Sequence, residues 1–177
     1  MDIRIEKTER AIRTAFLALR AQKPLEKITV KELCAAAYIN KSTFYAHYED
    51  LFALSDTLER EAVDAILQDI GKLGTYSLDT PEAFARALCI SFHAHLPTIN
   101  VLFSGKAQNR LADRLETGIK AHIFAVYPAW RQDPVMQIAL SYSIHGAYWA
   151  YTKNQNVDEA QLLDVIGQLA GALRALY

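Results

Sequence analysis

The apolar residues of this chain recur at helical spacing along almost its whole length. Ile12, Phe16 and Leu19 follow the i, i+4, i+7 pattern that places side chains on one face of a helix. Similar spacings continue toward the C-terminal end, and no alternating stretch is long enough to suggest a strand. The pattern therefore predicts an all-α fold.

Prolines, glycines and capping residues divide this pattern into about nine helices. Pro97 is expected to end the fifth helix, because proline cannot donate a helical hydrogen bond, and a short segment then reaches Gly105. Thr29, Asn40 and Asp158 are typical N-caps, and each precedes a run of helical spacing. The expected helices cover 7–21, 29–37, 41–48, 50–71, 80–97, 108–127, 134–154 and 158–177, with the short segment at 97–105.

Composition and charge narrow the class of protein. The chain of 177 residues is 51% hydrophobic and 22% charged, which is typical of a folded soluble protein. We expect a cytoplasmic protein, because there is no hydrophobic signal core at the N-terminus and no apolar run of ~18 residues. Cys34 and Cys89 both lie among apolar residues, so we expect them to be reduced and buried.

A segment near the N-terminus has the pattern of a helix-turn-helix. Two short helices are expected in succession, and the second reads KSTFYAHY. Leu33 and Phe44 fit the core between them, and Tyr48 follows the same apolar spacing, so we place it in the core rather than in a contact. The polar side chains of the second helix would then face outward, where hydroxyls and a lysine can contact phosphates and base edges.

The stretch ITVKELCAAAYINKSTFYAHYEDLFAL resembles the DNA-binding domain of TetR-type regulators. The hallmark of that family is T-F-Y-x-H-[FY] followed by an acidic, apolar helix start. The resemblance covers residues 8–58 closely. It implies a helix-turn-helix domain over 1–50 that continues into a linking helix at 50–71. It also implies a helical effector-binding and dimerisation domain over 72–177.

The resemblance implies which side chains contact DNA. The start of the second helix would contact phosphate and bases, the start of the third helix would enter the major groove, and its flank would bind phosphate. The matching positions are Thr29, Lys31, Lys41, Ser42, Thr43, Tyr45 and His47. Charge agrees with this assignment: residues 1–50 hold nine Lys/Arg against seven Asp/Glu, whereas the rest holds ten against thirteen.

Three residues depart from the family pattern. Tyr38 occupies the turn position where Gly is usual, and a left-handed backbone there would cost ~1–2 kcal/mol. Leu51 stands where many members have a phosphate-binding Lys at the start of the fourth helix. Ala46 replaces a larger contact residue. Together these departures predict fewer contacts per half-site than in a typical member, not loss of DNA binding.

The expected C-terminal domain is rich in aromatic residues at helical spacings. Aromatic stripes usually form core packing, but polar residues on the same helices also fit a ligand pocket. The candidate effector-binding residues are Phe84, Phe92, His95, Phe103, Phe124, Tyr142, His145 and Trp149. Packing alone remains the alternative interpretation.

The sequence provides no catalytic or metal-binding constellation. There is no glycine-rich phosphate loop and no G-x-S-x-G motif. His93 and His95 are two residues apart, which places them on different faces of a helix, and no cysteine or carboxylate cluster accompanies them. We therefore expect no enzyme activity, no metal and no cofactor.

Small residues interrupt the last two helices. Each glycine inside a helix costs ~1 kcal/mol relative to alanine, so a close approach by another helix would explain them. In the family that this chain resembles, the last two helices pair with those of a second copy. The candidate dimer residues are Gly146, Leu163, Ile166, Gly167, Ala170, Gly171 and Arg174. Packing within one chain is the alternative.

These observations lead to a ranked set of functions. The first is a homodimeric regulator, most simply a repressor, that binds double-stranded DNA at a palindromic operator and is released by a small-molecule effector. Activation instead of repression stays open. The alternative is a helical interaction module that no longer reads DNA, for which Tyr38 and Leu51 are the best support. An enzyme that binds small molecules would lack a catalytic group.

Overall fold

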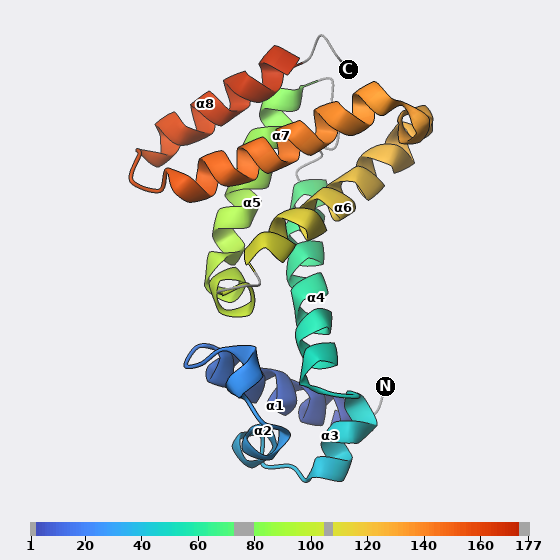
Figure 1. The fold of residues 1–177 in the computed structure, drawn as a ribbon, viewed down its shortest axis with the longest axis vertical. Helices are drawn as coiled ribbons and strands as arrows, with labels where there is room; N and C mark the ends of the chain where they lie inside the picture. Colours follow the sequence, from blue (N-terminus) through green and yellow to red (C-terminus); the bar gives the residue numbers. More distant parts are fainter. Residues whose placement is uncertain (1–2, 73–79, 105–107, 174–177) are drawn as a thin grey trace. The chain divides into compact units, whose positions relative to one another are not determined.

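The computed structural model describes residues 3–72, 80–104 and 108–173, and in these residues the chain is helical with no strand (Figure 1). The all-α fold class is therefore confirmed. The described helices are α1 (Ile3–Arg20), η1 (Leu25–Lys27), α2 (Val30–Ala36), α3 (Lys41–His47), α4 (Leu51–Lys72), α5 (Pro81–Leu102), α6 (Gln108–Val126), η3 (Pro128–Gln132), α7 (Pro134–Lys153) and α8 (Glu159–Ala172).

The capping residues that the sequence suggested begin their helices as expected. The Thr29 hydroxyl accepts a hydrogen bond from the Glu32 backbone N–H, and the Glu32 carboxylate accepts one from the Thr29 N–H, which completes a capping box. Asn40 caps α3, and Asp158 caps α8. At each of these positions the side-chain oxygen accepts a hydrogen bond from a backbone N–H of the first turn, which has no partner within the helix.

The expected break at Pro97 is wrong. Helix α5 continues through Pro97 to Leu102, so the segment that was expected to stand alone is part of α5, and the described residues form eight α-helices instead of about nine. Proline removes one backbone donor from a helix, and α5 tolerates that loss. The apolar side chains of Ile99 and Leu102 are almost completely buried, which keeps the last turns of α5 in place beyond the proline.

Contacts divide the chain into two compact units. Unit 1 contains Met1–Glu61 together with Pro97–Ala107, and unit 2 contains Ala62–Leu96 together with Gln108–Tyr177. Helices α4 and α5 therefore each contribute residues to both units. Pro97 is the first residue of α5 that belongs to unit 1.

Unit 1 is built around the fully buried side chains of Ile12, Phe16, Leu33, Phe44 and Leu54, which come from α1, α2, α3 and α4. These residues include the core positions that the helix-turn-helix pattern predicted. Besides this apolar core, the buried side chain of Arg20 connects two helices of unit 1. The Arg20 guanidinium at the end of α1 donates hydrogen bonds to the Leu102 carbonyl and to the Ser104 hydroxyl, both at 3.0 Å.

Unit 2 packs the second part of α4 with α5, α6, α7 and α8. Phe92 of α5 meets Tyr148 and Tyr151 of α7 edge to face, with ring centroids 5.9 and 5.7 Å apart. Ile119 and Ile123 of α6 are almost completely buried. Most aromatic residues of this region therefore form core packing. In the described residues, no helix is both long and apolar enough to cross a membrane.

Candidate functional site

Helices α2 and α3 present a short polar surface on unit 1. Each has seven residues and is joined to the other by the four residues 37–40. Phe44 is the only residue of α3 that is buried. Because one apolar side chain anchors this helix, its other side chains are available to a partner.

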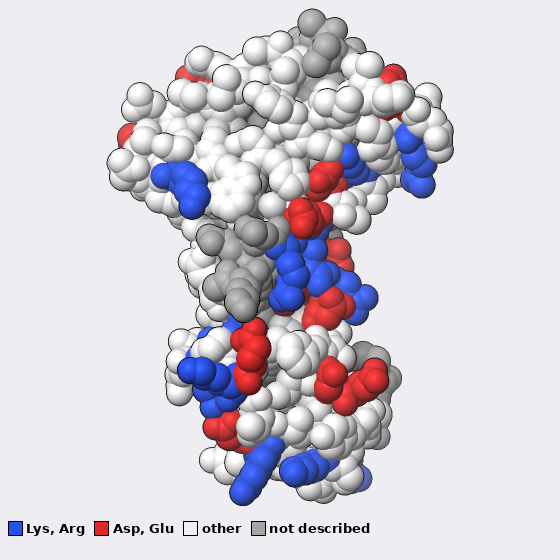
Figure 2. All heavy atoms as spheres, viewed as in Figure 1, with Lys and Arg blue, Asp and Glu red and all other residues white. Residues whose placement is uncertain are grey.

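The seven residues that the resemblance selected all lie on this pair of helices or at its caps. Thr29, Lys31, Lys41, Ser42 and Tyr45 are exposed, while Thr43 and His47 are half-buried. Tyr45 meets the buried Phe44 edge to face and still exposes 55% of its surface. Figure 2 shows Lys and Arg side chains at the end of the picture where α2 and α3 lie in Figure 1.

The hydroxyls at the start of α3 are already engaged with the helix cap. The Asn40 Oδ1 accepts hydrogen bonds from the Ser42 hydroxyl at 2.7 Å, from the Thr43 N–H at 2.7 Å and from the Thr43 hydroxyl at 2.9 Å. A hydroxyl has one donor and two acceptor positions. In this arrangement Ser42 and Thr43 can accept from a base or a water, whereas donation to a phosphate requires the hydroxyl to rotate.

One acidic group lies at the edge of this surface. The Glu32 carboxylate accepts hydrogen bonds from Lys23 at 2.6 Å, from the Thr29 hydroxyl at 2.9 Å and from the Thr29 N–H at 3.0 Å. These bonds, with that from Lys23 the largest contribution, lower the pKa of Glu32 to about 2. The carboxylate is therefore ionised at neutral pH, and Lys23 balances its charge.

A network behind α3 fixes its orientation within unit 1. The Tyr48 hydroxyl, just after the end of α3, donates to the Glu9 carboxylate at 3.3 Å. The Arg13 guanidinium binds the same carboxylate at 2.7 Å and also binds Glu61 of α4 at 2.9 Å. Tyr48 packs beside Phe44 but is half-buried, so the prediction that it belongs to the core is met only in part. Helices α1 and α4 thus hold the end of α3 through polar contacts as well as core packing.

Two of the three departures from the family pattern have a clear structural form. Leu51 is buried in the core, so this position provides no side chain for a phosphate contact. Ala46 is exposed and small. Neither position therefore presents a long polar side chain at the surface.

Tyr38 is the only non-glycine residue of the described chain with positive φ, at 56°. The Ile39 N–H donates to the Cys34 carbonyl at 3.0 Å, which closes the end of α2 in the way usual for a left-handed cap residue. The backbone at Tyr38 is therefore left-handed, which is the case that the sequence analysis considered. It costs ~1–2 kcal/mol relative to glycine, which has no β-carbon to strain.

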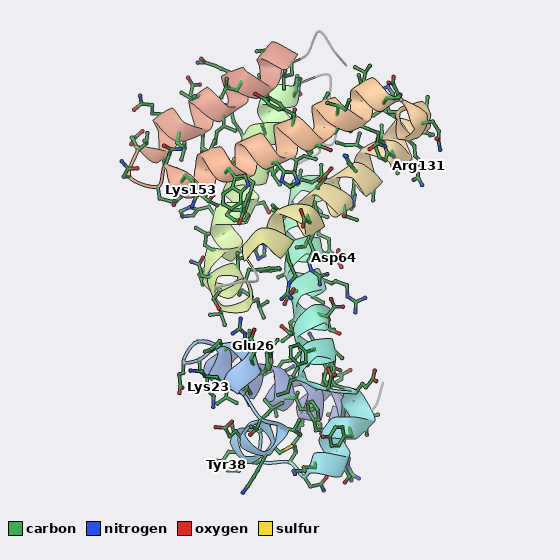
Figure 3. The ribbon with its side chains drawn as sticks, viewed as in Figure 1. Lys23, Glu26, Tyr38, Asp64, Arg131 and Lys153 are labelled. Atoms are coloured by element: carbon green, nitrogen blue, oxygen red, sulfur yellow. The ribbon has the colours of Figure 1, made fainter. Side chains whose placement is uncertain are left out.

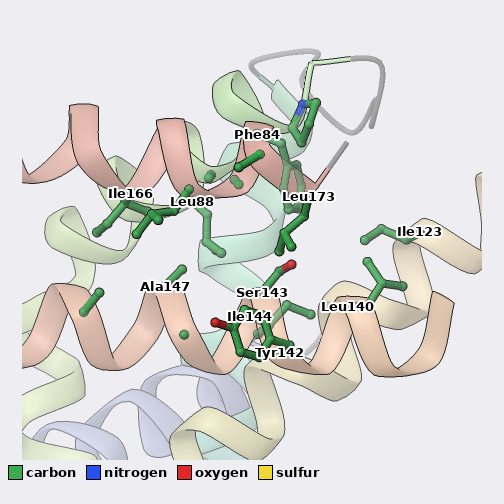
Figure 4. A pocket seen from close by; sticks show the side chains of 17 residues that line it. Phe84, Leu88, Ile123, Leu140, Tyr142, Ser143, Ile144, Ala147, Ile166 and Leu173 are labelled. Carbon is green, nitrogen blue, oxygen red and sulfur yellow. The ribbon is translucent and has the colours of Figure 1, made fainter. Parts of the chain in front are cut away.

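Unit 2 contains a cavity of about 360 Å³ between α5, α7 and α8 (Figure 4). This volume lies within the range of small-molecule sites. Only two of its lining side chains, Tyr142 and Ser143, carry polar groups, and none is charged. The remaining lining residues are Pro81, Phe84, Ala85, Leu88, Ile123, Leu140, Ile144, Gly146, Ala147, Ala150, Ile166, Leu169, Ala170, Ala172 and Leu173.

Most of the residues expected to bind an effector do not line this cavity. Phe84 and Tyr142 do, and Tyr142 is 70% exposed. Phe92 lines a separate void of only about 20 Å³, and Phe103 is buried in unit 1. Phe124 lies under the Arg131 guanidinium, and Trp149 contacts Lys153 and Tyr148. Helical spacing identified inward faces, but it could not decide which of them border an empty volume.

The two histidines expected in the pocket serve as ties between helices. His95 of α5 lies 2.9 Å from the Asp69 carboxylate of α4. His145 of α7 lies 2.8 Å from the Glu116 carboxylate of α6. The expectation that these polar groups converge on a ligand is therefore not met. A polar side chain on an apolar helix can satisfy a neighbouring helix instead of a bound molecule.

Glu116 is the centre of this polar cluster. Its carboxylate accepts hydrogen bonds from Lys120 at 2.6 Å and from the Ser141 hydroxyl at 2.5 Å, and Lys120 also lies 2.7 Å from that hydroxyl. The hydrogen bond from Lys120, followed by that from Ser141, lowers the pKa of Glu116 to about 2. The cluster joins α6 to α7 on a side of α7 that does not border the cavity.

The glycines of α8 pack within the chain. A β-carbon at Gly167 would lie 3.1 Å from the Arg86 Nε and 3.5 Å from the Glu82 backbone oxygen, and one at Gly171 would meet the Glu82 side chain. Ile166 is buried as well, while Leu163 and Ala170 are half-buried. The alternative of packing within one chain is therefore correct for these glycines. Gly146 is different, with no heavy atom within 4 Å of such a β-carbon, and Arg174 lies outside the described residues.

About half of the cavity residues that sequence reasoning missed are small, and the others are mostly Leu or Ile. Ala147 and Ala150 of α7 line the cavity together with Ala170 of α8. A repeated small residue on neighbouring helices was the available signal, and it was assigned to dimerisation.

In the described residues, no group of three or more His, Cys, Asp or Glu could hold a metal ion. Comparison of the chain with models of known protein families and with curated protein sequences finds no match.

Proposed function

We propose that this chain is a DNA-binding transcriptional regulator of the TetR type, a repressor that binds a palindromic operator as a homodimer. The observation that carries the proposal is the geometry of α2 and α3. Two short capped helices share one core, and α3 turns every side chain except Phe44 toward the surface or its edge. The sequence resemblance over residues 8–58 supports the same assignment.

The contacts available on this surface match those that a duplex requires. Lys41 and Lys31 supply charge for phosphates, Tyr45 supplies a phenol, and the hydroxyls at the start of α3 supply acceptors for base edges. A single head of this size makes few contacts. Affinity of ~10⁻⁸ M or tighter therefore needs two heads on one assembly.

An exposed apolar face on α7 and α8 supports pairing with a second copy. Helix α7 has no Asp, Glu, Lys or Arg between Pro134 and Thr152. Its polar side chains Ser141 and His145 bind Glu116 of α6 and so do not cover the outer side, whereas a surface helix is usually polar toward solvent. Its outer side carries exposed apolar residues, as does α8, and charged side chains are sparse there in Figure 2. The face consists of Val135, Ile138, Tyr142, Val165 and Leu169, of which Tyr142 and Leu169 also line the cavity.

The cavity of unit 2 supports a response to a small molecule. It has the volume of a ligand site, and its lining is apolar apart from Tyr142 and Ser143. We propose that it holds the effector and that the effector is neutral and largely apolar. Burying a charged group beside these residues would leave the charge without a partner.

The experiment is selection of bound duplexes from a randomised 40-base-pair pool, followed by affinity measurements on the enriched duplex. Tyr45→Ala and Thr43→Ala should each weaken binding by about tenfold. Lys41→Ala should weaken it and lower the slope of log affinity against log salt by about one, since one phosphate contact is lost. Lys153→Ala, which removes a lysine from unit 2, is the matched control and should change neither quantity.

The alternative is a helical interaction module that no longer reads DNA. The burial of Leu51 favours it, because this position cannot contact phosphate. Under this alternative the wild-type chain enriches no duplex. The proposal also fails if a duplex is enriched but all three head variants bind it as tightly as the wild type with their folds intact.

A further inference from the structure

Tyr38 combines two properties that the fold of an isolated chain does not explain. Its backbone is left-handed, a conformation in which a side chain is strained. Its side chain is 96% exposed, which makes it the most exposed large apolar side chain of the described residues. Asparagine or glycine would close the end of α2 with less strain. Backbone strain that brings no visible advantage to the folded chain is a reason to look for a functional role of the residue.

The position of Tyr38 relates it to the candidate DNA-binding surface. It precedes the α3 cap residue Asn40 by two positions and Lys41 by three. In a helix-turn-helix, the start of the second helix lies nearest the bases. The left-handed backbone turns the chain sharply between α2 and α3, and the Tyr38 side chain extends away from both helices (Figure 3).

The chemistry of the side chain fits a nucleic-acid backbone. A phenol donates a hydrogen bond to a phosphate oxygen, and its ring packs against sugar or against a thymine methyl group. Tyrosine needs only two torsion angles to be fixed, so ordering it on a partner costs little entropy. The ring carries no charge, which distinguishes its contribution from those of Lys31 and Lys41.

We propose that Tyr38 is a DNA-contacting residue, which reaches the sugar-phosphate backbone beside the start of α3. This inference rests on the proposed function. It revises the expectation of fewer contacts per half-site, because the residue that strains the turn also adds a contact. On this basis the missing phosphate contact at Leu51 is partly replaced from a different position.

The test compares Tyr38→Gly, Tyr38→Asn and Tyr38→Phe on the duplex enriched by the wild-type chain. Gly and Asn both accept the left-handed backbone and both remove the ring. We expect melting temperatures at or above that of the wild type and affinities about tenfold weaker. Tyr38→Phe keeps the ring and loses only the hydroxyl, so its affinity should fall by about threefold. The salt dependence should not change in any of the three.

Phosphate-ethylation interference adds a readout that altered folding would not produce. In the wild type, ethylation of one particular phosphate in each half-site should block binding, and this interference should disappear in Tyr38→Phe while that at the other phosphates remains. If the wild type binds and Tyr38→Gly and Tyr38→Asn bind equally well, this inference is overturned and the proposed function stands. If the wild type enriches no duplex, both are overturned.

Discussion

Units 1 and 2 differ in what their polar side chains do. In unit 1, Thr29 and Asn40 cap helices, and the polar residues of α3 remain on the surface where the sequence placed them. In unit 2, His95 and His145 were expected to face a ligand and instead tie helices together. The difference follows from range: a cap acts within three residues along the chain, whereas a pocket depends on which helices become neighbours.

The apolar residues show the same difference. In unit 1, helices α1, α2, α3 and the first part of α4 bury one another, and the predicted core residues Leu33 and Phe44 are among the buried ones. In unit 2, each side of an apolar helix can pack against another helix, border the cavity or stay exposed. Which residues lie on which of these sides depends on how the helices pack together.

The outer apolar face of α7 allows a test of whether unit 2 is buried only by its own helices or also packs against a second copy of the chain. We expect the wild type to sediment as a dimer at micromolar concentration. Ile138→Arg places a charge on that face and should raise the dimer dissociation constant by about a hundredfold or more, with DNA affinity falling as the two heads separate. Ile138 does not line the cavity.

The matched control is Ile90→Arg, at an exposed isoleucine that lies on another helix, α5, and exposes 52% of its surface against 70% for Ile138. This variant should remain dimeric. Sedimentation of the wild type as a monomer at ~10 μM would contradict the proposed pairing.

The cavity tests whether unit 2 binds small molecules through shape and apolar contact alone. Saturating decan-1-ol should raise the melting temperature by about 3–5 °C, because it binds the folded chain and not the unfolded one. Decanoate at the same free concentration should change it by no more than about 1 °C, since the lining has no Lys, Arg or His to pair with its carboxylate.

Ala147→Leu would fill part of the cavity and should remove the response to decan-1-ol. Ala121→Leu, at an exposed position of α6, is the control and should keep it. Equal responses to the alcohol and to the carboxylate would rule out a neutral apolar site.

The Glu116 cluster tests whether the polar residues of α7 stabilise unit 2. The pKa of Glu116 lies below its ordinary value of 4.5, at about 2, so its ionised form stabilises the folded state above pH 4.5. That contribution decreases as the pH falls from about 4.5 toward 2. Glu116→Gln should therefore lower the free energy of unfolding at pH 7 by about 1–2 kcal/mol, and the difference from wild type should shrink below pH 4.5.

Asp113→Asn, on the exposed side of α6, is the control and should have little effect at either pH. A Glu116→Gln variant as stable as the wild type at pH 7 would show that the cluster is only a surface arrangement.

Features that depend only on neighbouring residues could be predicted from the sequence alone. The helical spacing defined an all-α chain, and the caps at Thr29, Asn40 and Asp158 began their helices where expected. Within the short segment between Thr29 and Tyr48, the predicted core residues Leu33 and Phe44 are buried, whereas Tyr48 is half-buried. A capping residue forms hydrogen bonds with backbone groups only two or three residues away, so its effect can be predicted from the local sequence.

Features that depend on several helices at once could not be predicted from the sequence and required the folded structure. Pro97 lies inside α5 because buried residues beyond it hold the last turns, and its own residue type predicted the opposite. Gly167 and Gly171 meet Glu82 and Arg86 of the same chain, while the open position is Gly146. A cavity is the volume that packed side chains fail to fill, so its lining is a property of the whole packing and of no single stretch of sequence.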